Sequence, residues 1–406
     1  MALPDRENAL LNQNLLSRLT LPPEPPGTGL EGLEMAMPPA PVMKIQERAA
    51  AAENVLSKRA EAVPGVDGER VHKLVREGVT GMQKLEGEGT QARLTRTEIL
   101  GLEAIIVADG SRPVLMVQDG TINLADRDLS SELGRPWQQA AQDRLPGIER
   151  VAASVGVIQL PDFGNMRIGT GFAIAPGLIL TNRHVLEHIA RFFDGAWSWK
   201  YRAQIDFCGE LDRDRTLTFD LESVVLSGPD PIDDRVDFAN LDLAVIRLRA
   251  GTAGFPPGLD LGDRADVVKV SPKHRPSIYV VGFPAKPQQV LPGDGRGAAP
   301  PGAGTEYEDV LAPLFEDVFA VKRFAPGYVE AGPGQLIDDE RKWVMSHDAS
   351  TLGGNSGSCV VDFSGYNGLV VGLHFGGRAR VENWAHVLAA LKERFQGVGL
   401  QWNGAY

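Results

Sequence analysis

Three short motifs in this chain combine residue types that could carry out nucleophilic catalysis. His184 lies in Thr-Asn-Arg-His-Val, directly after the apolar run GLIL. Asp242 stands at the start of the apolar run LDLAVIRL, and Ser356 lies in Gly-Gly-Asn-Ser-Gly-Ser. A serine hydroxyl is a poor nucleophile at neutral pH and needs an adjacent base. Histidine suits that role because its pKa lies near neutrality.

The other residues of these motifs suit the same chemistry. A carboxylate that accepts from the far ring nitrogen holds the imidazole in one tautomer, and Asp242 could do this because a charge in an apolar strand is costly unless it is paired. The glycines before Ser356 allow a sharp turn. The amides of Gly354 and Ser356 could then donate to a developing oxyanion.

Each motif taken alone also has a structural explanation. A histidine at a strand end, an aspartate at a strand start and a GNSG turn all occur without any catalytic role. The conjunction favours catalysis, because the three motifs follow in the order His, Asp, Ser and each lies in the context that the chemistry needs.

The segments GTGFAIAPGLILTNRHV, LDLAVIRL and TLGGNSGSC resemble the chymotrypsin-like serine peptidases, most closely the bacterial glutamyl endopeptidase branch. The resemblance covers residues 150–398. It implies two antiparallel six-stranded β-barrels with the site between them. By this resemblance His184 and Asp242 belong to the first barrel and Ser356 to the second.

One position departs from the trypsin pattern. Trypsins place an aspartate before the nucleophile, where it pairs with a new amino terminus released by cleavage. Asn355 stands at that position here and carries no charge. We therefore expect no activation by cleavage at Arg150-Val151.

The resemblance also suggests a substrate preference. In the glutamyl branch, a histidine on the strand after the nucleophile contacts the substrate carboxylate, assisted by a threonine or serine five residues before the nucleophile. His374 and Thr351 occupy these positions, and Gly376 completes the expected substrate-binding set. Cleavage after Glu or Asp is the resulting expectation, and the alternative is that His374 only lines the pocket wall.

The expected fold class is mainly β, a chymotrypsin-like double β-barrel preceded by a mostly helical N-terminal region with a β-hairpin. Beyond residue 150 the chain has short β-branched runs separated by turns rich in Gly, Pro, Asp and Asn, which is typical of barrels. The expected divisions are a flexible Pro/Gly-rich segment (1–41), an N-terminal regulatory or docking region (42–147), the first barrel (148–265) and the second barrel with a C-terminal helix (266–406).

Smaller elements follow from local patterns. Residues 42–62 and 68–86 predict a helical hairpin, and Thr95 with Glu98 resembles a capping box. The apolar runs on either side of Asp109-Gly110 predict a β-hairpin over 102–124. Residues 382–396 predict a final helix. Residues 288–310 form a long irregular stretch, typical of function or disorder.

Composition excludes several classes of protein. The 406 residues carry a formal net charge of −12, which argues against nucleic acid and anionic membranes as partners. The chain has only two cysteines, Cys208 and Cys359, which excludes a disulfide scaffold. Their spacing does not match that of cysteine ligands to a metal. With no secretory signal and no apolar run that could span a bilayer, the expected compartment is the cytoplasm. No cofactor or metal is expected.

Two questions stay open at the level of sequence. The region before residue 148 could partly inhibit the site by adding a strand beside the cleft, or it could dock or sense a partner. The function could be a serine endopeptidase acting on a protein or peptide. Its expected partners are that substrate and a dedicated protein target or regulator. The alternatives are a non-catalytic protein-binding module on a peptidase fold and a hydrolase of small esters.

Overall fold

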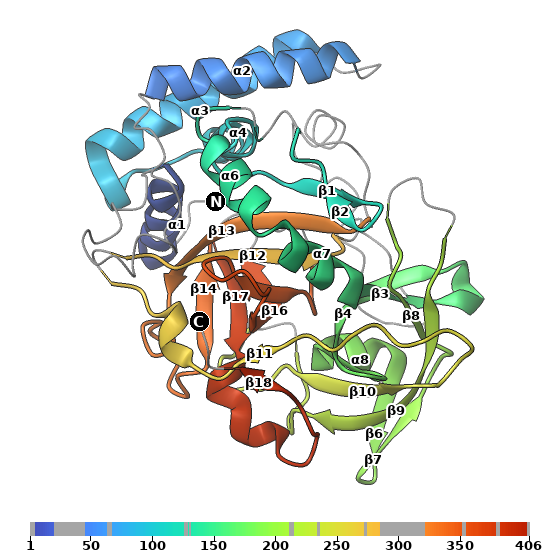
Figure 1. Ribbon diagram of the computed structural model, residues 1–406. Helices are drawn as coiled ribbons and strands as arrows, with labels where there is room; N and C mark the ends of the chain where they lie inside the picture. Colours follow the sequence, from blue (N-terminus) through green and yellow to red (C-terminus); the bar gives the residue numbers. More distant parts are fainter. Residues whose placement is uncertain are drawn as a thin grey trace, which may run out of the picture.

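Two antiparallel β-barrels lie below a helical region in the computed structural model of the chain (Figure 1). This confirms the expected mainly β double barrel with a helical N-terminal region. No helix in the described part of the chain is long and apolar enough to cross a membrane. The structure describes residues 5–19, 45–62, 67–125, 129, 131–210, 215–233, 236–271, 274–284, 321–350, 355–378 and 382–403.

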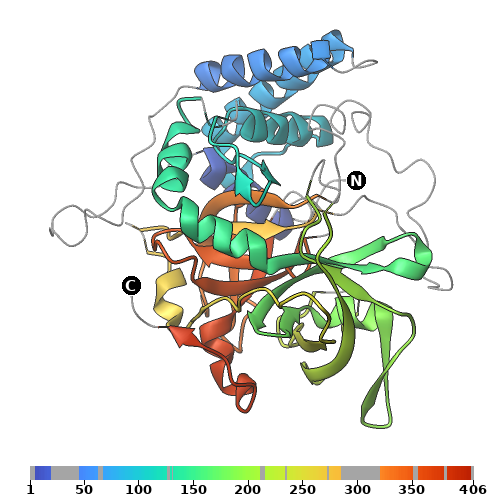
Figure 2. The same ribbon diagram turned by 45° about the vertical axis from the view of Figure 1, so that its right-hand side comes forward.

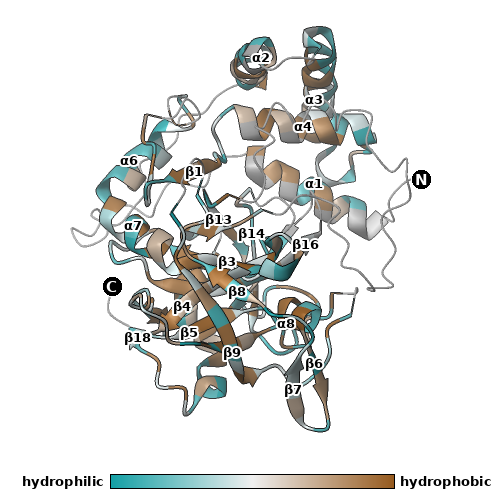
Figure 3. Ribbon diagram, turned by 90° about the vertical axis from the view of Figure 1, so that its right-hand side faces the viewer, coloured by the Kyte–Doolittle hydropathy of each residue, from teal (hydrophilic) through white to brown (hydrophobic). Residues whose placement is uncertain are grey.

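The first barrel closes in the strand order β10-β5-β4-β3-β8-β9. Its strands are β3 (Val155–Leu160), β4 (Met166–Ala175), β5 (Leu178–Thr181), β8 (Gln204–Asp206), β9 (Thr218–Ser227) and β10 (Ala244–Leu248). Neighbouring residues bury on opposite faces, as the pleat requires. Ile158 and Ile179 belong to a cluster made of first-barrel residues and the neighbouring α8 segment, whereas Val157 and Leu180 belong to a cluster shared with the second barrel. In Figure 3 brown, the colour of hydrophobic residues, marks much of β5 and β8.

The second barrel runs β12-β15-β16-β17-β14-β13 and closes through pairing of β12 with β13. Its strands are β12 (Ser277–Gly282), β13 (Arg323–Ala331), β14 (Val344–His347), β15 (Cys359–Asp362), β16 (Val370–Arg378) and β17 (Glu382–Val387). The short strands β11 (Leu261–Gly262) and β18 (Trp402–Asn403) pair with each other, and β11 also pairs with β16. The second barrel therefore extends to the C-terminal segment.

Further short elements lie outside the barrel strands. Helix α8 (Arg183–Ile189) leads into a hairpin of β6 (Ala190–Phe193) and β7 (Ala196–Trp199). The 3-10 turns are η1 (Gly89–Gln91), η2 (Pro161–Phe163), η3 (Ala265–Val268) and η4 (Leu388–Phe395).

Helices α1 (Asp5–Leu19), α2 (Ile45–Ala62), α3 (Gly68–Glu88) and α4 (Arg96–Ala108) bury a hydrophobic cluster of their own. Helices α2, α3 and α4 lie above the barrels in Figures 1 and 2, and α1 lies lower, at about the level of β13 in Figure 1. The predicted helical hairpin is confirmed as α2 and α3. The predicted capping box is also confirmed, since Thr95 Oγ1 accepts from the amide of Glu98, and Glu98 accepts from the amide of Thr95 at 2.7 Å.

The predicted β-hairpin over 102–124 is wrong in its first arm. The run AIIV lies inside α4, because the capping box starts a helix whose apolar residues are covered by neighbouring helices. Helix α4 ends at Asp109, whose backbone amide donates a hydrogen bond to the carbonyl of Ile105. The actual hairpin is smaller and turns at a second Asp-Gly pair, where Asp119 and Gly120 both have positive φ. Its strands are β1 (Leu115–Gln118) and β2 (Thr121–Ile122).

The segment after α4 packs with the barrels. Strand β1 pairs with β13, with Leu115 opposite Phe324. Helices α6 (Arg135–Asp143) and α7 (Leu145–Ser154) follow, and Trp137 and Ile148 join the buried cluster shared by both barrels. The chain from β1 onward thus belongs to the packing of the barrels, whatever the role of α1–α4.

The predicted helix over 382–396 is wrong in its first part. Residues Glu382–Val387 form β17, which pairs with both β14 and β16 and is needed to close the second barrel. The second part is helical, but it forms the 3-10 helix η4 (Leu388–Phe395) in place of an α-helix. Tertiary pairing overrode a local pattern that fitted a helix. The irregular stretch 288–310 lies outside the described residues, as does most of the predicted flexible segment 1–41.

Candidate active site

The end of β5 and the start of β10 lie side by side, and this register brings two motif residues together. Thr181, the last residue of β5, pairs with Ala244, the first residue of β10. His184 lies in the first turn of α8, just beyond β5, and Asp242 lies two residues before β10. The two residues therefore meet although they are far apart in sequence.

His184 and Asp242 are joined by two hydrogen bonds. The ring Nδ1 of His184 lies 2.6 Å from Oδ2 of Asp242, and the amide of His184 donates to Oδ1 at 2.9 Å. Nδ1 paired with a carboxylate carries a proton, which leaves Nε2 as the basic nitrogen. The backbone carbonyl of Asp242 accepts from Asn182 Nδ2 at 2.9 Å.

The environment keeps Asp242 ionised. Burial would raise the pKa of its carboxyl, but the imidazole of His184, the two hydrogen bonds from His184 and the nearby His386 together hold that pKa below its usual value. Asp242 is buried, and the side chain of His184 is 24% exposed. The carboxylate is thus shielded from solvent, whereas part of the imidazole is accessible to it.

Ser356 lies in the turn before β15, and this turn is bonded to both barrels. Its carbonyl accepts from Thr170 of β4 at 2.8 Å, and the amide of Gly357 donates to the carbonyl of His374 on β16 at 2.9 Å. Gly357 has a φ of 89°, and a Cβ there would lie 1.9 Å from the carbonyl oxygen of Thr170. Only glycine fits this position. Ser356 itself is partly exposed.

Comparison with known proteins identifies the family of this chain. The family model of the trypsin-like peptidase domain matches residues 169–373, half of the chain. This chain belongs to the trypsin-like peptidase family. A protein of Lysobacter enzymogenes named as a probable serine protease is 30% identical over 400 residues, covering 94% of this chain and 91% of the relative. The chain is therefore a serine peptidase.

Two solved structures are also similar to this peptidase. The inactive form of a serine-to-alanine mutant of Rv3671c from M. tuberculosis H37Rv is 17% identical, with a TM-score of 0.36 over 64% of this chain and 93% of that one. An inactive form of the Rv3671c protease is 19% identical, with a TM-score of 0.34 over 64% and 95%. At these TM-scores the two structures do not bear on function.

Part of the predicted site of the peptidase lies outside the described residues. Gly354, predicted to form the oxyanion hole with Ser356, and Thr351, predicted to bind substrate, fall in the segment 351–354. Gly376 lies on β16 and is partly exposed, with open space where a Cβ would be. Among the described residues there is no cluster of three His, Cys, Asp or Glu side chains that could hold a metal.

His374 lies on β16 and faces a second histidine. Its Nδ1 lies 3.3 Å from Nε2 of His347, and both residues are buried. Burial lowers the pKa of His374 well below its usual value, and His347 and His184 lower it further. His374 is therefore a neutral imidazole close enough to His184 for the two rings to influence each other.

The bond between Arg150 and Val151 is a poor target for activating cleavage in this peptidase. It lies inside α7, where the Val151 side chain is fully buried and Arg150 pairs with Asp260 at 2.7 Å. This placement agrees with the expectation drawn from Asn355.

His386 is a site residue that sequence reasoning missed. It lies on β17 of the second barrel, and its Nε2 accepts from the backbone amide of Asp242 at 3.0 Å. The sequence offered no signal, because the local pattern around His386 fits a helix and its partner Asp242 lies 144 positions away.

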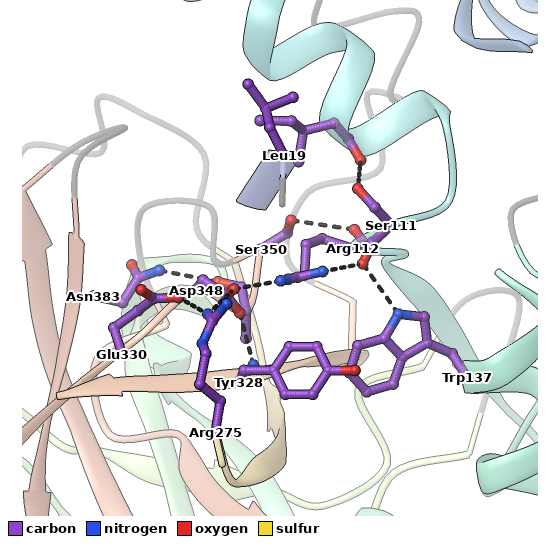
Figure 4. A network of polar contacts seen from close by, with 12 residues as sticks. Leu19, Ser111, Arg112, Trp137, Arg275, Tyr328, Glu330, Asp348, Ser350 and Asn383 are labelled. Carbon is purple, nitrogen blue, oxygen red and sulfur yellow. Dashed lines mark hydrogen bonds and ion pairs between the residues drawn. The ribbon is translucent and has the colours of Figure 1, made fainter. Parts of the chain in front are cut away.

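A second missed feature joins the N-terminal region to the chain just before Ser356 (Figure 4). Arg112, which lies between α4 and β1, donates to Asp348 at 2.5 Å, and Arg275 donates to the same carboxylate at 2.9 Å. Asp348 also accepts from the amide of Tyr328 at 2.7 Å. Ser350 donates to the carbonyl of Arg112 at 3.2 Å, so the anchored segment extends to within six residues of Ser356.

These contacts keep Asp348 charged. Burial would raise the pKa of its carboxyl, but Arg112 and Arg275 hold that pKa well below its usual range. Arg112 also lies over the ring of Tyr328, 4.9 Å from its centroid. The sequence could not pair residues 236 positions apart.

Proposed function

We propose that this chain is a serine endopeptidase that hydrolyses peptide bonds in a protein substrate, with Ser356 as nucleophile, His184 as general base and Asp242 as the residue that orients it. The observation that carries the proposal is the double hydrogen bond between Asp242 and His184. It supports an imidazole whose basic Nε2 is directed away from the carboxylate.

The proposed reaction has two halves. His184 Nε2 takes the proton of the Ser356 hydroxyl as its oxygen attacks the substrate carbonyl carbon. The amides of Gly354 and Ser356 stabilise the oxyanion of the tetrahedral intermediate. The imidazolium then protonates the leaving amine as the C–N bond breaks. Water, activated by the same imidazole, hydrolyses the acyl-enzyme and restores the serine.

A fluorophosphonate probe tests the nucleophile. Ser356→Ala should abolish both labelling and proteolysis, and Ser198→Ala, an exposed serine on β7, should change neither. Wild-type protein that folds but neither labels nor cleaves would instead support the alternative, a non-catalytic protein-binding module on a peptidase fold.

We further propose a preference for Glu or Asp before the scissile bond, as in the glutamyl endopeptidase branch. The support is the neutral, buried His374: if His347 donates to its Nδ1, its Nε2 carries the proton and can donate to a carboxylate. Thr351 and Gly376 are the proposed companions.

Matched peptides that differ only in the residue before the scissile bond test this preference. His374→Ala should lower kcat/KM for Glu more than for Gln, so that the two values converge. His274→Ala, an exposed histidine, is the control. Wild-type cleavage mainly after Arg, Lys or aromatic residues would contradict the preference.

The N-terminal region is proposed to regulate the site by partial autoinhibition, and the substrate to be one protein activated by cleavage in the cytoplasm. Because β1 and α6–α7 pack with the barrels, a chain starting at residue 110 is a better test than one starting at 148. Higher activity of the shorter chain would support autoinhibition, and equal activity would contradict it. Mapping of newly cleaved protein ends in cells, with Ser356→Ala as control, would identify the target.

A further inference from the structure

We propose that His386 is a positioning residue of the active site, whose unprotonated Nε2 holds the backbone of Asp242 so that its carboxylate faces His184. The inference rests on the proposed function of Asp242. It adds one side chain from the second barrel to the pair Asp242 and His184, which the first barrel provides.

Asp242 lies in an irregular segment, before β10 begins, so the sheet does not fix it. Side chains hold its backbone instead. Asn182 donates to its carbonyl at 2.9 Å, and His386 accepts from its amide at 3.0 Å. With both peptide groups held, the remaining freedom of Asp242 is rotation of its side chain, which the two bonds to His184 restrict.

Packing locks the imidazole of His386. Its ring stacks on Phe375 at 4.4 Å between centroids, and Trp343 meets it edge-on at 6.1 Å. Pairing of β17 with β14 and β16 places His386 opposite Val344 and Leu373. His386 is 1% exposed, so it cannot swing into solvent.

The protonation state of His386 suits an acceptor. Burial lowers its pKa to about 4, although the carboxylates of Asp242 and Asp339 oppose that shift. With Nε2 unprotonated, the ring proton must lie on Nδ1, which has no hydrogen-bond partner among the described residues. A buried donor left unpaired is unfavourable and needs an explanation. The hydrogen bond that Nε2 accepts from the Asp242 amide explains why the ring proton stays on Nδ1.

His386 also connects Asp242 to the strands that hold the nucleophile. β17 pairs with β16, and the carbonyl of His374 on β16 accepts from the amide of Gly357. Asp242 and Ser356, which lie on different barrels, are therefore both fixed to the β16–β17 pair. Loss of the His386 bond should let Asp242 shift relative to Ser356.

Two variants of the full chain separate an acceptor from a packing role. His386→Gln places an amide oxygen near the position of Nε2, and His386→Leu fills the space without an acceptor. We expect kcat and the rate of fluorophosphonate labelling of Ser356 in the folded chain to fall on the order of 10- to 100-fold in His386→Leu, with KM nearly unchanged. Both should recover largely in His386→Gln. Equal rates in wild type and both variants, or equal losses in both variants at matched thermal stability, would overturn the inference.

A measurement on the unmodified protein covers the case in which the variants do not fold. Nitrogen-15 spectra of labelled histidine should show His386 protonated at Nδ1 and unprotonated at Nε2, with a scalar coupling from the Asp242 amide to Nε2. A proton on Nε2 at neutral pH would overturn the inference. It would leave the proposed function untouched, because that function fails only if Ser356 proves unreactive.

Discussion

At the scale of single residues, the proposed mechanism depends on His184, whose two ring nitrogens have different tasks. Nδ1 of His184 is committed to Asp242, and the amide of His184 binds the second oxygen of the same carboxylate. A carboxylate held by two donors cannot rotate without losing one of them. The orientation of the imidazole is therefore a property of the backbone as well as of the side chains.

Replacing Asp242 with Asn tests this division of tasks. The amide would keep the shape but would favour the wrong tautomer of His184, so we expect kcat to fall on the order of 10³- to 10⁴-fold at neutral pH. Steady-state kinetics on a peptide substrate would measure it. A loss below about 10-fold would mean that Asp242 does not orient the base.

The buried histidines predict how stability depends on pH. The pKa of His386 is lowered to about 4 in the folded chain, against about 6.5 in an unfolded one. Between these values the unfolded chain binds a proton that the folded chain does not, so the free energy of unfolding falls as pH falls from about 6.5 to about 4. His386 alone would contribute about 3 kcal/mol to this fall.

Urea denaturation at several pH values measures the effect. His386→Gln should flatten the pH dependence in this window without removing it, because the pKa of His374 is lowered too. Asp242 and Asp348 act in a lower window, since their pKa values are depressed and their stabilisation is lost only below about pH 3.8. An unchanged slope in His386→Gln would contradict the prediction.

At the scale of elements, the crossing of α3 and α4 depends on two glycines. A Cβ on Gly101 would lie 2.3 Å from the backbone nitrogen of Gly78, so the two helices are in backbone contact there. Gly101→Ala should force them apart and destabilise the helical region by about 1–3 kcal/mol. Gly87→Ala, in open space on α3, is the matched control and should be neutral or slightly stabilising. Hydrogen exchange in α3 and α4 would report the difference.

How far the sequence predicted these elements depended on whether the deciding contacts were local. The capping box at Thr95 and the strand end before His184 are short-range patterns, and the structure confirms both. The run AIIV and residues 382–387 were assigned to the wrong element, because helix packing and strand pairing with distant parts of the chain decided their state. His386 and the Arg112–Asp348 pair had no sequence signal, since each acts only through a partner far along the chain.

At the scale of the whole molecule, the ion pair of Arg112 and Asp348 fixes the chain before β1 to the second barrel. Arg112→Met would leave Asp348 buried with one arginine fewer, and we expect the free energy of unfolding to fall by about 3 kcal/mol. The double variant Arg112→Met with Asp348→Asn should recover part of this loss, because the uncompensated charge is gone. Chemical denaturation would test both. A loss below about 1 kcal/mol in the single variant would show that Arg275 suffices.

The turn that carries Ser356 has a consequence for inactivation. Its carbonyl is tied to Thr170 on one barrel and the amide of its neighbour Gly357 to His374 on the other, so it spans a seam rather than belonging to either side. A small sliding of one barrel against the other would break this seam while each barrel kept its own closed sheet. Mild denaturant should therefore abolish activity before circular dichroism shows any loss of β-structure. A ligand bound between the two barrels at this turn would inhibit the enzyme without occupying the substrate-binding site.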